Sequence, residues 1–439
     1  MNNIAYKYKL NPNRYQREQL AQLAGSTRWL WNYMLDLNMK TYKESKKFVF
    51  NFEMHKLLPK LKEENIWLKD TPSQSLQQKC KDLDTALKSV KKSKFGFPKF
   101  KSKNKSSDSF RIPQTNGHIK ITDTQIQIPK IGKVEWTYHR PLPIDAKIKS
   151  ITVTKDIDDW YVSVLLEIPD VSPMTYIDSD KTIGVDLGLN SFAMMSNGDM
   201  IESQRFAKKA AKRLKHYQRQ LKHKTKGSNN IKKAYKKIAR VHRDIRNARM
   251  NWLHHQSKML VEKYDVICIE DLSIKGMMSS TNKYTSKKKP KEERKGRSIG
   301  DQGWGIFVTQ LKYKAKNKGK HVTKIGAYEP STQTCSCCGV VKTGKDKLEL
   351  KDREFICQNP LCNDYLKAKD RDINAAINIQ FWGLMQTPDI ELVSNTDGMS
   401  EINACGDTQT TDLGTVIDQV SMKQESKNNL EATLSLVVW

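Results

Sequence analysis

The sequence predicts a multidomain α+β protein that contains an α/β part. Its 439 residues exceed a typical domain of roughly 100–200 residues, so we expect two to four folding units. Apolar residues recur at helical spacing through the first hundred residues, and the hydrophobic period changes to two between residues 105 and 170. From Thr182 onward, strand-like and helix-like segments alternate, which is typical of an α/β fold.

The composition is that of a globular chain with a strong positive charge. Hydrophobic residues make up 37% of the chain, and no stretch approaches the ~20 apolar residues of a membrane span. The N-terminus lacks the apolar segment of a signal peptide, so we expect neither secretion nor membrane insertion. The formal net charge is +29, although residues 381–439 carry two Lys against nine Asp and Glu. Because such a positive excess repels itself, nucleic acid is the expected partner, and a solvated basic surface is the alternative.

The first hundred residues are expected to be mostly helical. Asn11 and Pro12 favour a helix start, with Asn as the N-cap and Pro in the first turn. An apolar stripe follows over residues 20–37, and a short helix is expected over 52–67. Residues 76–90 carry apolar side chains at spacings of three and four, which predicts another helix.

A β-domain is expected next, with the helical block inserted into it. Residues 91–105 are basic and dotted with aromatic side chains, and Gly96 and Pro98 prevent a regular helix there. Residues 1–10 alternate in hydrophobicity and add a further strand to a small barrel or sandwich of about six strands. The other strands are expected at 110–112, 118–121, 125–128, 133–136, 147–154 and 160–168.

The α/β part begins with a strand and a strongly basic helical segment. Residues 183–188 are expected to form a strand that ends in a glycine-rich turn, and a hairpin crosses residues 196–199. Between residues 205 and 249 there are 18 Lys and Arg against one acid, Asp244. The polar run 227–230 is expected to break this segment into an antiparallel helical hairpin.

Further strands and helices complete the α/β part. Residues 264–269 predict a buried strand that ends in Glu270 and Asp271, whereas 283–297 is a charged linker that we expect to be mobile. The tail after Leu384 is polar, acidic and poor in aromatics, so we expect it to be disordered. The remaining predicted elements are an amphipathic helix at 304–315, a strand at 321–328 and a helix at 372–381.

Acidic residues stand where several of these elements begin or end. Asp186 ends one strand, Glu270 ends a second, and Asp370 and Asp372 open a helix. The apolar runs beside them fix their backbones, so these carboxylates could converge at one edge of a sheet and hold divalent metal ions. Phosphodiester hydrolysis uses such a site, where two Mg²⁺ ions about 3.5–4 Å apart activate water and stabilise the leaving oxygen. A single acid at a strand end is also common in ordinary turns.

The chain has eight cysteines, and five of them lie within 28 residues. Cys338 with Cys335 or Cys337 gives one pair, and Cys357 with Cys362 gives a second, as in a tetrahedral four-thiolate zinc site. We prefer Cys335, because the adjacent Cys337 and Cys338 cannot both reach one ion easily. The second pair has four intervening residues where two are commoner. We expect a structural zinc, and a redox dithiol is the alternative.

These motifs together resemble the TnpB family, the RNA-guided nucleases of insertion sequences that are related to the miniature type V CRISPR effectors. The matching motifs are Ile-Gly-Val-Asp-Leu-Gly-Leu-Asn at 183–190, Ile-Cys-Ile-Glu-Asp-Leu at 267–272, the cysteine motif at 331–339 and Asp-Arg-Asp-Ile-Asn-Ala-Ala-Ile-Asn at 370–378. Residues 95–101 and 109–111 look like the family's link between recognition helices and wedge barrel, and 301–313 like its helix after the second nuclease motif. The resemblance covers about residues 1–385.

The resemblance implies a RuvC-like nuclease of RNase H fold, whose catalytic, Mg²⁺-binding acids are Asp186, Glu270 and Asp372. Asp370 is the alternative for the third acid, although a helix N-terminal acid also complements the helix dipole. A zinc ribbon inserted in the nuclease would guide the target strand toward the acids, and Arg353 could touch the scissile phosphate.

The resemblance also implies domain boundaries. They are a wedge β-barrel at 1–10 and 105–170, a helical recognition domain at 11–104, the RuvC-like nuclease at 171–333 and 370–384, the zinc-ribbon target-strand module at 334–369 and a disordered acidic tail at 385–439.

The implied function is RNA-guided cleavage of double-stranded DNA beside a short flanking motif, with an omega-type guide RNA as partner. The basic helical pair would line the RNA–DNA heteroduplex, and a solvated coiled-coil surface is the alternative. Its expected contacts are Lys208, Lys209, Lys212, Arg213, Lys232, Lys233, Lys236, Lys237 and Arg240.

Three other functions are weighed against this one. They are a compact type V CRISPR effector, a catalytically silent RNA-guided DNA-binding repressor, and a transposase that performs strand transfer itself. The resemblance implies a prokaryotic, cytoplasmic and nucleoid-associated protein, whereas the choice between monomer and homodimer stays open.

Overall fold

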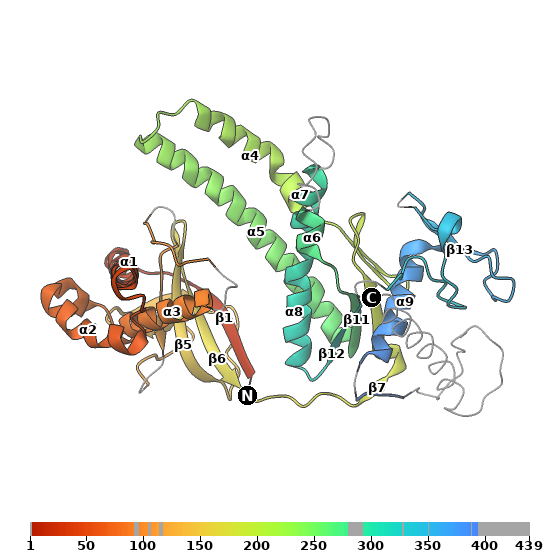
Figure 1. Ribbon diagram of the computed structural model, residues 1–439, viewed down its shortest axis with the longest axis horizontal. Helices are drawn as coiled ribbons and strands as arrows, with labels where there is room; N and C mark the ends of the chain where they lie inside the picture. Colours follow the sequence, from red (N-terminus) through yellow and green to blue (C-terminus); the bar gives the residue numbers. More distant parts are fainter. Residues whose placement is uncertain are drawn as a thin grey trace. The chain divides into compact units, whose positions relative to one another are not determined.

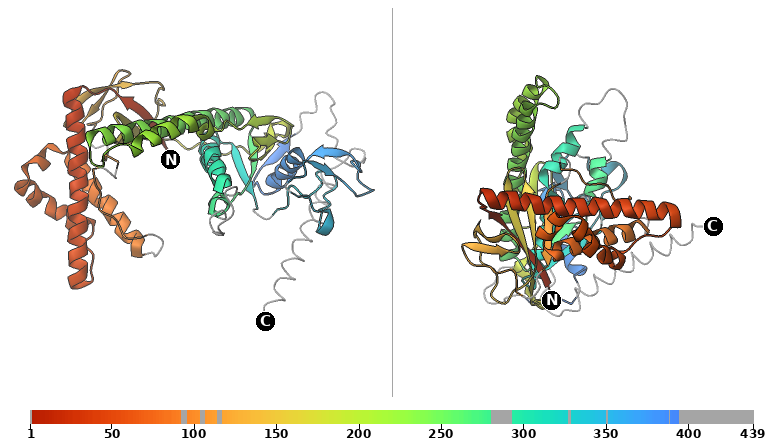
Figure 2. Two further views of the ribbon diagram at one scale, coloured as in Figure 1. Left: turned by 90° about the horizontal axis from the view of Figure 1, so that it is seen from above. Right: turned by 90° about the vertical axis from the view of Figure 1, so that its left-hand side faces the viewer.

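The computed structural model consists of two compact units, which are described separately (Figures 1 and 2). The first unit comprises Met1–Met174, Arg205–Met259 and Gly305–Lys320, and the second comprises Thr175–Gln204, Leu260–Trp304 and His321–Trp439. The structure describes residues 2–91, 96–103, 107–113, 117–279, 293–326, 329–349, 351–387 and 389–393.

A six-stranded antiparallel sheet forms the centre of the first unit. Its strand order is β2-β5-β6-β1-β4-β3. The strands are β1 (Asn2–Leu10), β2 (Ser109–Pro113), β3 (Gln125–Ile128), β4 (Gly132–Thr137), β5 (Lys147–Asp156) and β6 (Asp159–Ile168). The first strand of the chain lies between β6 and β4, so the helical block lies in the chain between two strands of this one sheet. Closure of this sheet into a barrel stays a prediction.

Alternation of apolar side chains accounts for the register of this sheet. Trp160, Val162, Val164 and Leu166 of β6 are all buried, and the residues between them are more exposed. The strand predicted over 118–121 is wrong, because within the described residues this segment makes only an isolated bridge from Ile121 to Ile126.

The region predicted to be helical consists of three α-helices and one short 3-10 helix among the described residues. They are α1 (Arg14–Ser45), α2 (Asn51–Glu64), the short 3-10 helix η1 (Ile66–Asp70) and α3 (Ser73–Lys91), and α1 is one long helix (Figure 2). The predicted N-cap Asn11 is wrong, since its backbone N–H donates to Glu135 O of the sheet over 2.7 Å. Asn13 caps α1 instead, and its Oδ1 accepts from Gln16 N over 2.8 Å.

The predicted basic hairpin is confirmed as α4 (Phe206–Lys222) and α5 (Asn229–Lys263). Gly227 lies between the two helices with φ +87°, a conformation that favours glycine. Arg213 of α4 pairs with Asp244 of α5 over 3.2 Å, so the helices run beside one another at this point. The predicted amphipathic helix is α8 (Trp304–Lys316), whose buried side chains are Trp304, Phe307, Leu311 and Ala315.

A five-stranded sheet of order β10-β9-β8-β11-β12 forms the centre of the second unit. Its strands are β8 (Thr182–Asp186), β9 (Ser191–Met195), β10 (Met200–Glu202), β11 (Val266–Glu270) and β12 (His321–Ile325). Strands β8, β11 and β12 are parallel to one another, whereas β9 and β10 run antiparallel to their neighbours. Parallel strands end at the same edge of the sheet, and this edge carries the predicted acids.

Helix α9 (Arg371–Met385) packs very closely on this sheet because a glycine lies on each side of the contact. Gly184 is in the sheet and faces α9, and Gly383 is in α9 and faces the sheet. A Cβ added at Gly184 of β8 would lie 2.0 Å from the backbone oxygen of Ala376. A Cβ added at Gly383 of α9 would lie 2.4 Å from the sulfur of Cys268 in β11. The two missing side chains therefore set the distance between α9 and the strands.

The remaining elements of the second unit are short. They are β7 (Tyr176–Asp178), η2 (Ser179–Lys181), α6 (Ile274–Ser279), α7 (Glu293–Gln302), η4 (Gly344–Asp346), β13 (Glu354–Ile356), β14 (Ala368–Asp370) and β15 (Glu391–Val393). Of the linker predicted at 283–297, residues 293–297 begin α7 instead, and 283–292 lie outside the described residues.

The predicted disordered tail is wrong at its start, since β15 pairs with β7, and residues 394–439 lie outside the described part. Of the predicted strand at 321–328, β12 ends at Ile325, and residues 327–328 are outside the description. Among the described helices, none is long and apolar enough to cross a bilayer.

Candidate active site and metal centre

The three predicted acids come from three elements of the second unit. Asp186 is the last residue of β8, and Glu270 is the last residue of β11. These strands are parallel, with Val185 opposite Ile269, so the two acids follow at the same edge of the sheet. Asp372 lies in the first turn of α9, which the contact at Gly184 brings onto β8.

The electrostatics of Asp186 indicate that the other two carboxylates act on it. Burial, together with the charges of Asp372 and Glu270, raises the pKa of Asp186 to about 7 against the opposing charge of Arg371. Burial also raises the pKa of Glu270. A buried carboxylate whose charge is opposed by two neighbouring carboxylates fits a site for a hard divalent cation.

The three carboxylates do not gather as closely as the ligands of a closed metal site. Among the described residues, only a group of cysteines brings three or more ligand atoms within 4.8 Å of one another. The acids therefore form an edge that a cation and a substrate oxygen could share.

Asp370 has a different place from Asp372. It is the N-cap of α9, and its Oδ1 accepts hydrogen bonds from Asp372 N over 2.8 Å and Ile373 N over 3.0 Å. This carboxylate is therefore occupied by the helix end, as expected for an N-terminal acid.

The cysteine cluster contains the four predicted ligands. The sulfurs of Cys335, Cys338, Cys357 and Cys362 all lie within 4.8 Å of one another. The Cys335–Cys362 and Cys338–Cys357 distances are 3.9 and 3.7 Å. A tetrahedral ion with Zn–S bonds of about 2.3 Å would space its sulfurs by about 3.8 Å, so the cluster could hold such an ion.

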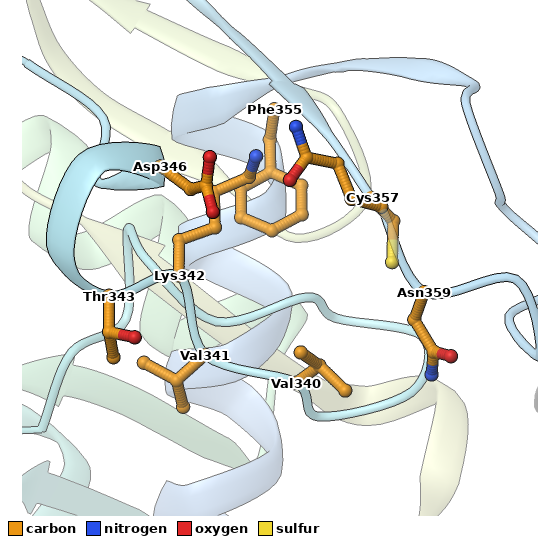
Figure 3. A pocket seen from close by; sticks show the side chains of 9 residues that line it. Val340, Val341, Lys342, Thr343, Asp346, Phe355, Cys357 and Asn359 are labelled. Carbon is orange, nitrogen blue, oxygen red and sulfur yellow. The ribbon is translucent and has the colours of Figure 1, made fainter.

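The cysteine module also has a cavity of about 370 Å³ (Figure 3). Val340, Val341 and Phe355 supply its apolar lining, and Lys342 Nζ lies 5.3 Å from the centre of the Phe355 ring. None of the three predicted acids lines this cavity. It is therefore a feature of the module itself rather than of the carboxylate edge.

Two buried asparagines, to which the sequence analysis gave no role, join α9 to the first cysteine loop. Asn374 Oδ1 accepts from Ser336 N over 2.9 Å, and its Nδ2 donates to Thr334 O over 2.7 Å. Asn378 Nδ2 donates to Ser331 O over 2.9 Å and to Thr334 O over 2.7 Å. Their spacing of four residues places both on one helix face, which was the signal available in the sequence.

Arg353 contacts the turn that follows Asp186. Its Nη1 and Nη2 lie 3.1 and 2.7 Å from the side-chain oxygen of Asn190, with the Asn190 amide oriented so that this oxygen accepts. Arg371 of α9 also holds this module, because its Nη1 donates to Glu349 O and Asp352 O over 2.7 and 3.1 Å. The cysteine module thus contacts the turn after β8 and helix α9.

All the predicted nucleic-acid contacts on α4 and α5 are exposed, and several already have protein partners. Lys236 Nζ and Arg240 Nη2 pair with Asp158 over 2.8 and 2.7 Å. Arg213 pairs with Asp244. The other members of this set are Lys208, Lys209, Lys212, Lys232, Lys233 and Lys237, which lie on the exposed sides of the two helices.

Sequence reasoning missed the acidic hairpin between β5 and β6 that these cations contact. Besides Asp158, Asp156 pairs with Arg246, and Asp159 pairs with Arg243 over 2.8 Å. Three acids within four residues at a strand turn were the available signal. Part of the basic face of α5 is therefore neutralised within the first unit itself.

Three known protein families match parts of the chain. A family described as a probable transposase matches residues 164–281, a Cas12f1-like TNB domain matches 304–379, and a helix-turn-helix domain matches 1–47. In the structure, residues 1–47 form β1 and the single helix α1 instead of two helices joined by a turn.

A solved structure described as a Cas12f1-sgRNA-target DNA complex has a similar fold. Its TM-score is 0.50 at 15% identity, and the alignment covers 86% of this chain and 84% of that chain. At this identity the similarity concerns the mixed helix-and-sheet fold alone.

Relatives cover most of the chain. A protein of Escherichia coli (strain K12) described as "Putative RNA-guided DNA endonuclease InsQ" is 32% identical over 381 residues, which are 85% of this chain and 91% of the relative. A relative from Streptomyces pristinaespiralis with the same general description is 30% identical over 388 residues, covering 87% and 89%. The chain belongs to the TnpB family.

Proposed function

We propose that this protein is an RNA-guided, Mg²⁺-dependent DNA endonuclease. The observation that carries the proposal is that Asp186 and Glu270 end the neighbouring parallel strands β8 and β11, and that the charge of Asp372, in the first turn of α9, acts on Asp186. The descriptions of the two relatives support the same function. In this assignment the five-stranded sheet with α9 is a RuvC-like nuclease of RNase H fold.

Asp186, Glu270 and Asp372 would hold the Mg²⁺ ions. When bound, the ions supply an activated water and stabilise the oxygen that leaves the phosphorus. Asp186 must give up its proton to act as a ligand, and its raised pKa makes that step sensitive to pH below neutrality. Arg353, which contacts Asn190, would contact the substrate phosphate from the cysteine module.

Cys335, Cys338, Cys357 and Cys362 would hold a structural Zn²⁺. Four sulfurs at mutual distances that suit a tetrahedral ion, all supplied by protein, leave no open position for catalysis. The module would act as a zinc ribbon that guides the target strand, and its bonds to α9 through Asn374 support this role.

The partners would be a guide RNA and double-stranded target DNA with a short flanking motif. Base pairing with the guide would read the sequence, and the protein would bind backbone phosphates and the flanking motif. The net charge of +29 and the exposed cations of α4 and α5 support nucleic-acid binding. In the first unit, the six-stranded sheet would be the wedge domain, and α1 to α3 the recognition domain.

The test begins with the RNA that accompanies the protein. The chain is expressed with its native flanking DNA, and the RNA that purifies with it is sequenced. Mg²⁺ and a plasmid library with a randomised segment beside the matching target are then added. We expect one discrete RNA and cutting that depends on the guide. A heterogeneous RNA population without guide-dependent cutting would contradict the proposal. Discrete RNA without cutting would instead indicate a silent DNA-binding protein.

A further inference from the structure

A small cationic cavity lies in the first unit, whereas the carboxylate edge belongs to the second. It has a volume of about 100 Å³ and lies among α1, α3 and the chain that leads into β2. Its polar lining consists of three cations and three hydroxyl side chains, which are Arg28, Lys79, Lys101, Thr27, Ser107 and Ser109.

The basic segment that supplies Lys101 is held firmly against α1. Asn32 bonds the Lys101 backbone twice, because its Nδ2 donates to Lys101 O and its Oδ1 accepts from Lys101 N, both over 2.8 Å. Trp31 Nε1 donates to Lys99 O over 3.1 Å. Lys101 Nζ lies 3.8 Å from the centre of the Trp31 ring. The cavity is therefore formed before any ligand arrives.

The cavity has more positive than negative charge around it. Arg28 pairs with Asp108, and Lys79 pairs with Asp82 over 3.0 Å, whereas Lys101 faces the Trp31 ring. Among the described residues, the three cations that line the cavity therefore have two carboxylates paired with them.

The buried position of these cations adds to the case for an anion. The Lys79 side chain is only 10% exposed. Burial and then the charge of Lys79 lower the pKa of Lys101 to about 8, against the opposing charge of Asp82. A lysine ammonium that is partly desolvated beside a second one is stabilised when an anion binds between them.

We propose that this cavity binds one phosphate group of a nucleic-acid backbone, with Lys101 and Lys79 as cationic donors and Ser107 and Ser109 as hydroxyl donors. The volume corresponds to about three water molecules, which suits a phosphate and is well below the ~300 Å³ of a small-molecule pocket. Backbone phosphates bound in this way position a nucleic acid without reading its sequence. The inference rests on the proposed function, because it says where an RNA-guided nuclease holds its nucleic acid.

The phosphate could belong to the guide RNA or to the target DNA, and the experiment separates the two. Lys101→Met keeps an unbranched apolar side chain over Trp31 and removes the charge. Affinity is measured against salt concentration in two arms, guide RNA with free protein and target duplex with guide-loaded protein. In the arm that holds the phosphate, the slope of log K against log salt is expected to fall by about 0.7–0.9.

Two variants control this result. Lys101→Arg keeps the charge and is expected to restore the wild-type slope. Lys81→Met removes an exposed charge of α3 that does not line the cavity, and the slope should then change by less than half as much. If Lys101→Met does not fold, Ser107→Ala is used instead, and a severalfold loss of affinity at an unchanged slope is expected.

Two outcomes would overturn the assignment. If the wild type binds both polymers and Lys101→Met leaves both slopes unchanged, the cavity holds no backbone phosphate. An equal loss in Lys81→Met would likewise show that only the general surface charge matters. A wild type that binds neither polymer specifically would overturn the proposed function itself, and this result is distinct from the other two.

Discussion

Asp370 and Asp372 are two residues apart, yet their carboxylates have different surroundings. Asp370 Oδ1 accepts two backbone hydrogen bonds at the start of α9, whereas the charge of Asp372 acts on Asp186. The sequence indicated both as candidates for the third acid. The choice depends on where the helix begins, and a helix boundary is poorly determined by sequence alone.

This pair of acids gives the first prediction. Asp372→Asn should lower the guide-directed cleavage rate at saturating Mg²⁺ by more than about 100-fold, because even the loss of an outer-shell partner costs 10–100-fold. Asp370→Asn is the matched control and should stay within a few-fold of wild type, since Asn caps a helix about as well as Asp. Equal losses in the two variants would contradict the assignment.

Asp186 gives a prediction for stability in the absence of divalent cations. Its folded pKa of about 7 exceeds the unfolded value of about 3.9, so the folded state binds the proton more tightly. The stability contributed by this residue is therefore full below about pH 4 and is lost as pH rises to 7. Asp186→Asn should raise the free energy of unfolding by about 2–4 kcal/mol at pH 8 and by almost nothing at pH 4.

Denaturant unfolding of wild type and variant under identical conditions, at pH 4 and pH 8 without Mg²⁺, checks this expectation. The control is Asp370→Asn, which keeps the helix cap and should show no such pH-dependent gain. A variant at Asp186 that is less stable than wild type at pH 8 would show that its carboxylate is not repelled by its neighbours.

At the scale of elements, α9 organises the second unit. It carries Asp372 at one end, contacts β8 and β11 through Gly184 and Gly383, and holds the cysteine loop through Asn374 and Asn378. The apolar pattern predicted this helix and both strands. It did not predict the close contact between α9 and the sheet. The role of Gly184 and Gly383 can be recognised only when the backbone that faces each glycine is known.

Gly184→Ala tests the close contact. The added Cβ would meet the backbone oxygen of Ala376, so α9 must shift, and we expect a loss of about 1–3 kcal/mol in stability together with slower cleavage. Gly25→Ala in α1 is the control, since its nearest neighbour would be an Arg28 side-chain atom at 3.8 Å. That variant should gain about 0.5–1 kcal/mol. Thermal unfolding of both variants tests this prediction. A Gly184→Ala variant as stable as the wild type would contradict it.

The cysteine module gives a prediction for metal removal. Cys338→Ser should reduce bound zinc well below one ion per chain, because one of four thiolates is lost. The loop that Asn374 and Asn378 hold would loosen, so cleavage should fall by at least about 10-fold while guide-RNA affinity stays within a few-fold. Cys80→Ser is a control outside the module. Metal analysis with cleavage assays tests this, and full activity without zinc would contradict it.

At the scale of the whole molecule, the order of the elements was largely predictable. Alternation in residues 1–10 indicated the strand that β1 forms, and the positive charge indicated a polyanion partner. The ion pairs between Asp158 and α5 were not predictable, because they join residues about 80 positions apart that only the fold brings together. The strand predicted over 118–121 did not form for a local reason, since one isolated bridge from Ile121 to Ile126 does not make a ladder.

The measurement that tests the central claim most directly is the cleavage of a plasmid that carries the flanking motif and a guide-matched target. Wild type and Asp186→Ala, each loaded with the same RNA, are compared with and without Mg²⁺ on matched and mismatched plasmids. We predict Mg²⁺-dependent cutting of the matched plasmid by the wild type alone, with the variant still binding RNA and target. Equal cutting by Asp186→Ala, or cutting that ignores the guide, would contradict the account.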